Sequence, residues 1–219
     1  AVEGGEGFVL ALGILKASLH AAGAAVLAAE ARRQLRAMVR STYSHSTAVN
    51  ESKGEFAYDC SGFVDYALAR SLPDAFWTLK AASGPRPLAR DFVNFFSSLS
   101  APRGRWRRLA RATDLVPGDL VAWLKPRDVV SSNTGHVMIV RERPTPSVED
   151  PTEILVPIID ATRRPHGPTD SRTDADGTGL GTGTIGLLVD ANGVPQRYRW
   201  AGGWSPKIET TEIALGHLD

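Results

Sequence analysis

The hydrophobic pattern changes its period halfway along the chain, and this change constrains the fold more than any other feature. In residues 29–40 and 88–99 apolar side chains recur at helical spacing, and a helical pattern also follows Cys60. The inward-facing residues are expected to be Leu35, Met38 and Val39 in the first segment and Leu88, Phe92, Phe95, Phe96 and Leu99 in the second. From residue 120 onward short apolar runs replace this spacing, at 120–124, 136–143, 153–160, 185–190 and 194–200, which is typical of strands. Helices followed by antiparallel strands predict an α+β fold.

The first 28 residues carry an apolar stretch that has two interpretations. Residues 8–28, FVLALGILKASLHAAGAAVLA, end in small residues, as a secretory signal does before its cleavage site. However, Glu3 and Glu6 lie where a signal would carry positive charge. Lys16 and His20 interrupt the apolar run, which makes it poorly suited to span a bilayer. We therefore favour a helix packed in the core over a targeting remnant, and expect no stable membrane insertion.

Composition limits the classes of protein and of site. Of the 219 residues 42% are hydrophobic and 22% charged, so we expect one globular domain over residues 29–219 behind the segment 1–28. The net charge of +1 gives no general attraction to nucleic acids, and the basic stretch 103–111 is better explained as a solvated surface than as a polyanion site. A single cysteine excludes an internal disulfide and a thiolate-rich metal site.

That cysteine lies in the stretch YDCSGFVDY at residues 58–66, where a helical pattern begins. The N–H groups and dipole of a helix start stabilise a thiolate, and so does a neighbouring imidazolium. A structural explanation is also open, because most single cysteines are buried and act as small hydrophobes. Among the five histidines His136 stands apart, since it follows Asn-Thr-Gly and opens an apolar strand.

A simple antiparallel register gives His136 a carboxylate partner. If 136–143 pairs with 153–160, Asp160 lies opposite His136, at the Cβ separation of about 4.5–5.5 Å that directly opposed residues have. The same register sets Arg143 against Glu153, Met138 against Ile158 and Val140 against Val156. Cys60, His136 and Asp160 then form a nucleophile, a general base and an orienting acid. A buried Cys60 and an unrelated surface His136 remain an equally open interpretation of the same residues.

Three blocks of the sequence resemble a known family. DCSGFV at 59–64, LVPGDLVAW at 115–123 and GHVMIV at 135–140 are similar, in this order, to the signature blocks of the NlpC-type cell-wall cysteine peptidases. The resemblance implies a papain-like architecture, with N-terminal helices packed on a small antiparallel β-sheet. It also implies that Cys60 is the nucleophile and His136 the base. The family's third polar position is commonly histidine and is Asp160 here.

The resemblance also implies a substrate and further site residues. It indicates a hydrolase that cleaves an amide bond in a peptidoglycan stem peptide, or in another small peptide, without a metal or an organic cofactor. Asp59 and Ser61, which flank the cysteine, would hold the free amine of the substrate. Tyr43 matches one position of an aromatic motif that the family carries upstream of the cysteine. We expect His166, in the turn Pro-His-Gly, to be a substrate contact or plain surface, and it is the second choice for the catalytic histidine.

Two other functions stay open on this scaffold. The first is an acyltransferase, in which an alcohol or amine resolves the acyl-thioester, and the second is a catalytically silent binding module. A cell-wall substrate favours a periplasmic or secreted protein, with a cytoplasmic one as the alternative. The glycines of 177–186 predict a flexible loop near the site. Their GTGTIG sequence precedes a strand, whereas a dinucleotide-binding motif opens a helix.

Overall fold

The computed structural model describes residues 22–172 and 177–219, and the expectation for residues 1–21 lies outside them. The helices are α2 (Ala22–Ala37), α3 (Cys60–Ser71), α4 (Pro73–Ser83) and α5 (Ala89–Ser98), with single 3₁₀ turns at Glu51–Lys53 and Ala112–Asp114. The strands are β1 (Arg40–Tyr43), β2 (Ala48–Asn50), β3 (Glu55–Tyr58), β4 (Trp106–Leu109), β5 (Leu120–Leu124), β6 (Gly135–Val140), β7 (Thr145–Pro146), β8 (Glu153–Thr162), β9 (Gly179–Val189), β10 (Pro195–Gly203), β11 (Glu209–Thr210) and β12 (Ile213–Leu218). The expected α+β class is confirmed.

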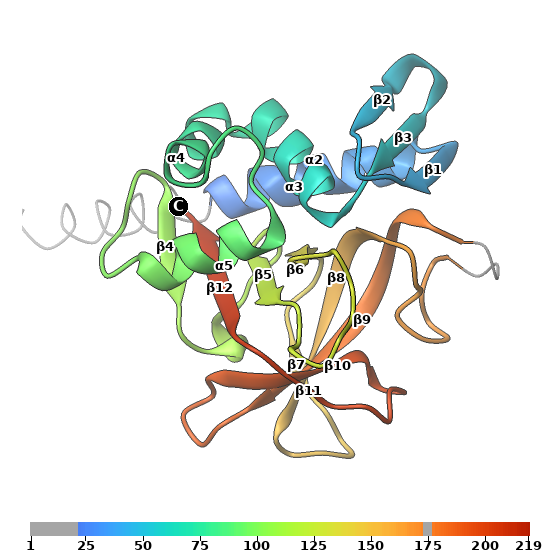
Figure 1. Ribbon diagram of the computed structural model, residues 1–219. Helices are drawn as coiled ribbons and strands as arrows, with labels where there is room; N and C mark the ends of the chain where they lie inside the picture. Colours follow the sequence, from blue (N-terminus) through green and yellow to red (C-terminus); the bar gives the residue numbers. More distant parts are fainter. Residues whose placement is uncertain (1–21, 173–176) are drawn as a thin grey trace, which may run out of the picture.

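Two sheets organise the strands. A nine-stranded antiparallel sheet has the order β11-β10-β9-β8-β6-β5-β12-β4, with β7 paired to β8, and a separate three-stranded sheet has the order β1-β3-β2. The main sheet is thus larger than the small sheet that the resemblance implied. The helices gather on one side of it, while β8, β9 and β10 extend away from them (Figure 1).

Helix α2 runs through the expected boundary at residue 28 and packs in the core. Its buried face consists of Ala24, Leu27, Ala28, Ala31 and Gln34, which recur at the spacing of one helical face. Of the residues expected to face inward, Leu35 and Met38 are partly buried and pack against the core, whereas Val39 lies beyond the end of the helix and is 82% exposed. The true face is rich in alanine, and small side chains let a helix approach its neighbours closely.

Helix α5 confirms the second helical prediction. Phe92, Phe95, Phe96 and Leu99 are buried, and Leu88 is half-buried. Helix α4 is an additional helix that begins at a proline. Proline is well tolerated in the first turn of a helix, where its missing N–H has no partner in any case. Pro73 occupies this first position in α4.

The five predicted strands are all present, with shifted ends. β5 matches its prediction of residues 120–124, whereas β6 ends at Val140 rather than at residue 143. The turn at Ala191-Asn192-Gly193 joins β9 and β10 into a hairpin, and Asn-Gly is a common sequence in such turns. The loop predicted from the glycines is wrong, because β9 begins at Gly179 and pairs along its length with β8. The stretch 103–111 contains strand β4, paired with β12.

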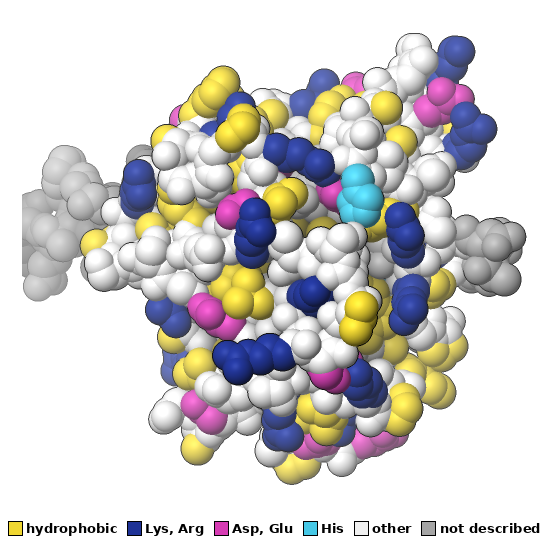
Figure 2. All heavy atoms as spheres, in the orientation of Figure 1, with side chains coloured by type: hydrophobic (Ala, Val, Ile, Leu, Met, Phe, Trp, Pro, Cys, Tyr) yellow, Lys and Arg dark blue, Asp and Glu magenta, His cyan; other side chains and the backbone are white. Residues whose placement is uncertain are grey.

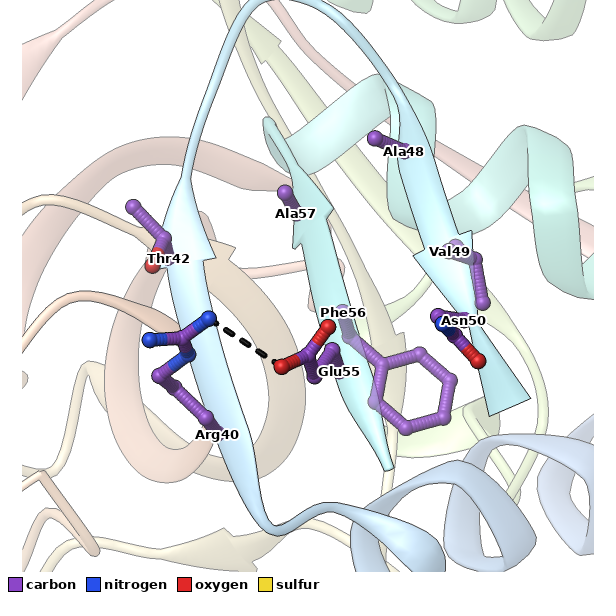
Figure 3. A pocket seen from close by; sticks show the side chains of 8 residues that line it. All are labelled: Arg40, Thr42, Ala48, Val49, Asn50, Glu55, Phe56 and Ala57. Carbon is purple, nitrogen blue, oxygen red and sulfur yellow. Dashed lines mark hydrogen bonds and ion pairs between the residues drawn. The ribbon is translucent and has the colours of Figure 1, made fainter. Parts of the chain in front are cut away.

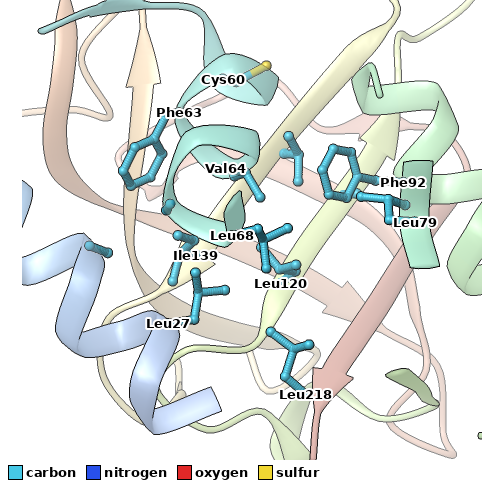
Figure 4. Packing of buried hydrophobic residues seen from close by; sticks show 14 of the residues in the cluster. Leu27, Cys60, Phe63, Val64, Leu68, Leu79, Phe92, Leu120, Ile139 and Leu218 are labelled. Atoms are coloured by element: carbon cyan, nitrogen blue, oxygen red, sulfur yellow. The ribbon is translucent and has the colours of Figure 1, made fainter. Parts of the chain in front are cut away.

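The main sheet separates two apolar clusters. On the helix side, Leu27, Phe63, Val64 and Ile139 belong to one cluster, which Figure 4 shows between α2, α3 and the sheet. On the other side the sheet curls over a second cluster. There the rings of Trp123 in β5 and Tyr198 in β10 stack with centroids 4.0 Å apart, although β6, β8 and β9 lie between these two strands in the sheet order. The curl therefore brings β10 over the strand that carries His136.

Within residues 22–172 and 177–219 no helix is long and apolar enough to cross a membrane.

Candidate active site

Cys60 is the first residue of α3. Asp59 caps this helix, because its carboxylate accepts a hydrogen bond of 2.8 Å from the N–H of Gly62. The sulfur lies on the first turn, turned away from the apolar side chains farther along the helix (Figure 4). It accepts hydrogen bonds from the backbone N–H groups of Val137 in β6 and of Ser61. The thiol thus lies against the strand residue that follows His136.

His136 and Asp160 are in contact, although the predicted register is wrong. Val140 lies opposite Ile158, not opposite Val156, so the pairing of β6 with β8 is shifted by two residues. A shift of two keeps every side chain on its original face, since side chains alternate with a period of two. Nε2 of His136 therefore still reaches Oδ2 of Asp160, at 2.6 Å. The other expected pairs are also wrong: β6 ends at Val140, and on that edge of β8 the carbonyl of Glu153 accepts from the N–H of Ser147, not from Arg143.

His166 is not a surface residue. Its side chain is fully buried, its ring stacks on Trp200 with centroids 4.1 Å apart, and its Nε2 lies 2.9 Å from Oδ2 of Asp160. Nδ1 lies 2.6 Å from the carbonyl oxygen of Trp200, so it must donate a proton to that bond. Both ring nitrogens of His166 thus lie within hydrogen-bond distance of an oxygen, one of the Asp160 carboxylate and one of the Trp200 carbonyl.

Asp160 is the centre of a buried group of charges. Its second oxygen, Oδ1, accepts from Nη2 of Arg172 at 2.9 Å, and Arg172 also forms an ion pair with Asp170. Two carboxylates, Asp160 and Asp170, thus lie against the guanidinium of Arg172 in one buried group, with the ring of His166 beside Asp160. The pKa of Asp160 is lowered well below its usual value, because the charges of His166 and Arg172 outweigh the effect of burial.

Two glycines of β9 make room for this group. A Cβ atom on Gly181 would lie 2.7 Å from Nε of Arg172, and a Cβ atom on Gly183 would lie 2.6 Å from Cβ of His166. Any larger residue at these positions would displace the charged side chains. The glycines of GTGTIG thus allow side chains to cross the strand closely, and they form no phosphate-binding turn.

The thiol is neutral in the resting site, which corrects the expectation of a thiolate. Burial, together with the charges of Asp59 and Asp160, raises the pKa of Cys60 to about 12 despite the two N–H donors. Burial also lowers the pKa of His136, and the positive charges of His166 and Arg172 act in the same direction. Cys60 and His136 therefore rest as thiol and imidazole. No hydrogen bond joins them directly within the described parts of the chain, where Nδ1 of His136 has no partner.

A cavity of about 250 Å³ opens at Cys60. It is lined by Tyr43, His45, Asp59, Cys60, Ser61, Arg86, Leu88, Ala89, Ser132, Asn133, Thr134 and Gly135. The structure therefore brings Tyr43, Asp59 and Ser61 to the nucleophile, whereas His166 lies outside this lining. His45 and Arg86 are cavity residues that the sequence alone did not identify. A second hollow, shown in Figure 3, lies on the small sheet between β1, β3 and β2 and shares no lining residue with the first.

Asp59 is fully occupied by neighbouring groups. Oδ1 accepts from the Ser61 hydroxyl at 3.0 Å and from the N–H of Gly62, while Oδ2 lies 2.8 Å from Nη2 of Arg86 and 3.1 Å from Nδ1 of His45. A carboxylate has about four acceptor positions. All are therefore used, so a substrate amine would have to displace Arg86 or His45 before it could bind Asp59.

Metal binding has one candidate set among the described residues. Ligand atoms of His136, Asp160 and His166 all lie within 4.8 Å of one another. The set does not fit a metal ion well, because Asp160 already bonds the guanidinium of Arg172, and a cation placed there would face a second positive charge. The charge pattern of the cluster is complete with its own side chains.

The second expected signature motif, LVPGD, has a structural role. The carboxylate of Asp119 accepts from the N–H of Val116 at 2.8 Å and lies 2.6 Å from Nδ1 of His217, which is buried. These bonds tie the turn before β5 to the C-terminal strand β12. His217 therefore stabilises the fold through Asp119.

The comparison with known proteins yields one informative relative. No protein-family model and no solved structure matches this chain. The uncharacterized protein R653 of Acanthamoeba polyphaga mimivirus is 30% identical to it over 179 residues, which cover 74% of this chain and 77% of the viral protein. The chain therefore belongs to the same family as this viral protein.

Proposed function

We propose that the protein is a papain-like cysteine hydrolase that cleaves an amide bond, with a peptidoglycan stem peptide as the substrate. The observation that carries the proposal is the placement of Cys60 at the start of α3 against β6, whose His136 is held by Asp160 at 2.6 Å. A nucleophile at a helix start, a histidine and an orienting carboxylate are the parts that thiol-based acyl transfer needs. A cell-wall substrate would place the protein in the periplasm or outside the cell.

In the first half of the reaction the thiol attacks the substrate carbonyl carbon. His136 takes the S–H proton on Nδ1 while the S–C bond forms, because the resting thiol is neutral. This step requires the Cys60 sulfur to reach Nδ1 of His136. The sulfur already lies near, because it contacts the backbone N–H of the next residue, Val137. The backbone N–H at the start of α3 stabilises the oxyanion. The C–N bond then breaks as the imidazolium gives its proton to the leaving nitrogen.

In the second half water hydrolyses the thioester. His136 removes a proton from the water as its oxygen attacks, and the collapse of the adduct returns that proton to the sulfur. Asp160 stabilises the transient imidazolium, but it shares its charge with His166 and Arg172. The low pKa of His136 follows from burial and from these cations, and it keeps the base unprotonated at neutral pH.

A catalytically silent binding module is the second candidate. It is favoured by one observation, the burial that leaves Cys60 only 6% exposed and raises its pKa. A structural cysteine would show the same burial. An acyltransferase uses the same residues and differs only in the acceptor that resolves the thioester.

Digestion of purified peptidoglycan, with the fragments identified by mass spectrometry, tests the proposal. We expect the wild type to release shortened stem peptides, and the Cys60→Ala variant to release none while remaining folded by circular dichroism. Ser71→Ala is the matched control, because Ser71 lies on the same helix and bonds only the carbonyl of Ala67. Turnover that survives in Cys60→Ala would refute the nucleophile, and added amine that appears in the products would identify the acyltransferase. A folded wild type that releases no fragment would favour the silent module.

A further inference from the structure

The cavity beside Cys60 presents a guanidinium and no free carboxylate. Asp59 is its one acidic lining residue, and its four acceptor positions are all occupied. Arg86 uses Nη2 for Asp59, its side chain is 44% exposed, and none of its other N–H groups has a hydrogen-bond partner among the described residues. The ring of His45 is held on the same oxygen at 3.1 Å and is half exposed.

We infer that this cavity recognises a carboxylate of the substrate, with Arg86 as the residue that binds it. This inference rests on the proposed function, which identifies the cavity as the substrate site, and it adds the chemical group that the cavity binds. Asp59 holds the guanidinium in place from one side, so the unused N–H groups can form charge-assisted bonds with an incoming anion. A guanidinium offers a planar pair of donors that matches the two oxygens of a carboxylate.

The surroundings favour an anion over an amine. Arg163 lies over the ring of Tyr43, with its guanidinium carbon 5.0 Å from the ring centroid, and Tyr43 lines the cavity. Leu88, the small residues Ala89 and Ser61, and residues 132–135 complete the lining. Figure 2 shows a histidine on this face of the molecule with Lys and Arg side chains on several sides of it. A cationic surround steers anions toward the cavity and disfavours a free amine.

The carboxylate can belong to the C-terminus of a peptide or to an acidic side chain. Two matched pairs of probes separate these sources: acetyl-alanyl-alanine against its C-terminal amide, and acetyl-glutamate α-amide against acetyl-glutamine α-amide. Each pair differs only in one negative charge. Titration of the ¹⁵N-labelled protein, followed by NMR at the amides of Ser61, Thr134 and Gly135, measures binding without any turnover.

We expect the acid of one pair to bind at least about tenfold more tightly than its amide, and the preferred pair identifies the source. Arg86→Gln should abolish this preference, while Arg86→Lys should keep part of it. Arg40→Gln is the control, because Arg40 is an exposed arginine paired with Glu55 in the other hollow and should leave the preference unchanged. Raising the salt concentration should weaken the acids and leave the amides unaffected.

Equal affinity for acid and amide in both pairs would overturn the inference, and so would an acid preference that survives in Arg86→Gln. The wild-type comparison decides the question even where the Arg86→Gln variant does not fold. Because the titration needs no catalysis, its failure is distinct from that of the proposed function. If the protein preferred the acids but did not cleave peptidoglycan, the carboxylate site would be supported and the proposed hydrolase function would be refuted.

Discussion

Replacing Asp160 by Asn tests whether the buried charges are balanced as described. The substitution keeps the shape of the side chain and removes one negative charge. In the wild type this fully buried carboxylate accepts from His136, His166 and Arg172 at 2.6, 2.9 and 2.9 Å. After the substitution Asp170 is the one buried carboxylate among the described residues that still pairs with Arg172.

The expected cost follows from the loss of one partner of a buried ion pair. Such a change costs about 3–5 kcal/mol, because it leaves the opposite charge uncompensated. An asparagine oxygen in the place of Oδ2 can still accept two of the three bonds, which places the expected loss near the lower end, at about 3 kcal/mol. A domain with a total stability of about 5–15 kcal/mol would still fold at 25 °C with this loss.

Urea denaturation of the wild type and of Asp160→Asn, followed by circular dichroism, measures the difference. Asp114→Asn is the control, because it removes a carboxylate from an exposed pair with Arg111 and should cost less than about 1 kcal/mol. The pKa of Asp160 is depressed in the folded state, so its contribution is fully present above the unfolded pKa of about 3.9 and is lost as the pH falls through the lower folded pKa. The difference should thus be constant from pH 5 to 7 and shrink below pH 4. A loss no larger than that of the control would refute the balanced charge cluster.

Two further predictions concern titrating groups on α3. Burial raises the pKa of Asp65 to about 8, and one of its oxygens has no hydrogen-bond partner. Between pH 4 and 8 the folded protein therefore holds a proton that the unfolded chain has released, so the free energy of unfolding should fall as the pH rises through this range. Asp65→Asn should remove this pH dependence and stabilise the protein above pH 8 by about 1–3 kcal/mol. Urea midpoints that fall equally with pH in both proteins would contradict this prediction. With a pKa of about 12, Cys60 should react with iodoacetamide at a rate that rises steadily from pH 6 to 10 in the folded protein, whereas a rate that levels off near neutral pH would indicate a resting thiolate.

Much of the local structure follows from the order of residues alone. Helix α5 and strand β5 lie within a residue of their predicted bounds, because each has an apolar pattern of one clear period. The small sheet of β1, β2 and β3 before α3 could not be predicted, because strands of three or four residues are too short to show a clear hydrophobic pattern. The strand of glycines was missed for another reason. Gly181 and Gly183 have no side chains, so they carry no apolar alternation, and only the neighbouring Arg172 and His166 explain them.

The candidate site could be found from the sequence only in part. Cys60 stands before a helical pattern and His136 opens a strand, and both features are local. Their partnership with Asp160 survives an error of two residues in the register, because a shift of two preserves the face of a strand. His45 and Arg86 carry no local signal. They are cavity residues only because the chain folds back on Asp59 from both sides of α3.

The sequence by itself determined the α+β class, the helix that begins at the cysteine and the strand that begins at His136, because hydrophobic period and helix capping act over a few neighbouring residues. The tertiary structure decided the charge of the site. His166 turned from an expected surface residue into a buried partner of Asp160 because the sheet curls and brings Trp200 of β10 against it. The protonation of the thiol was decided in the same way, since burial and the charges of Asp59 and Asp160 depend on how distant segments pack. Electrostatic interactions act through space between such segments, and spacing along the chain does not encode them.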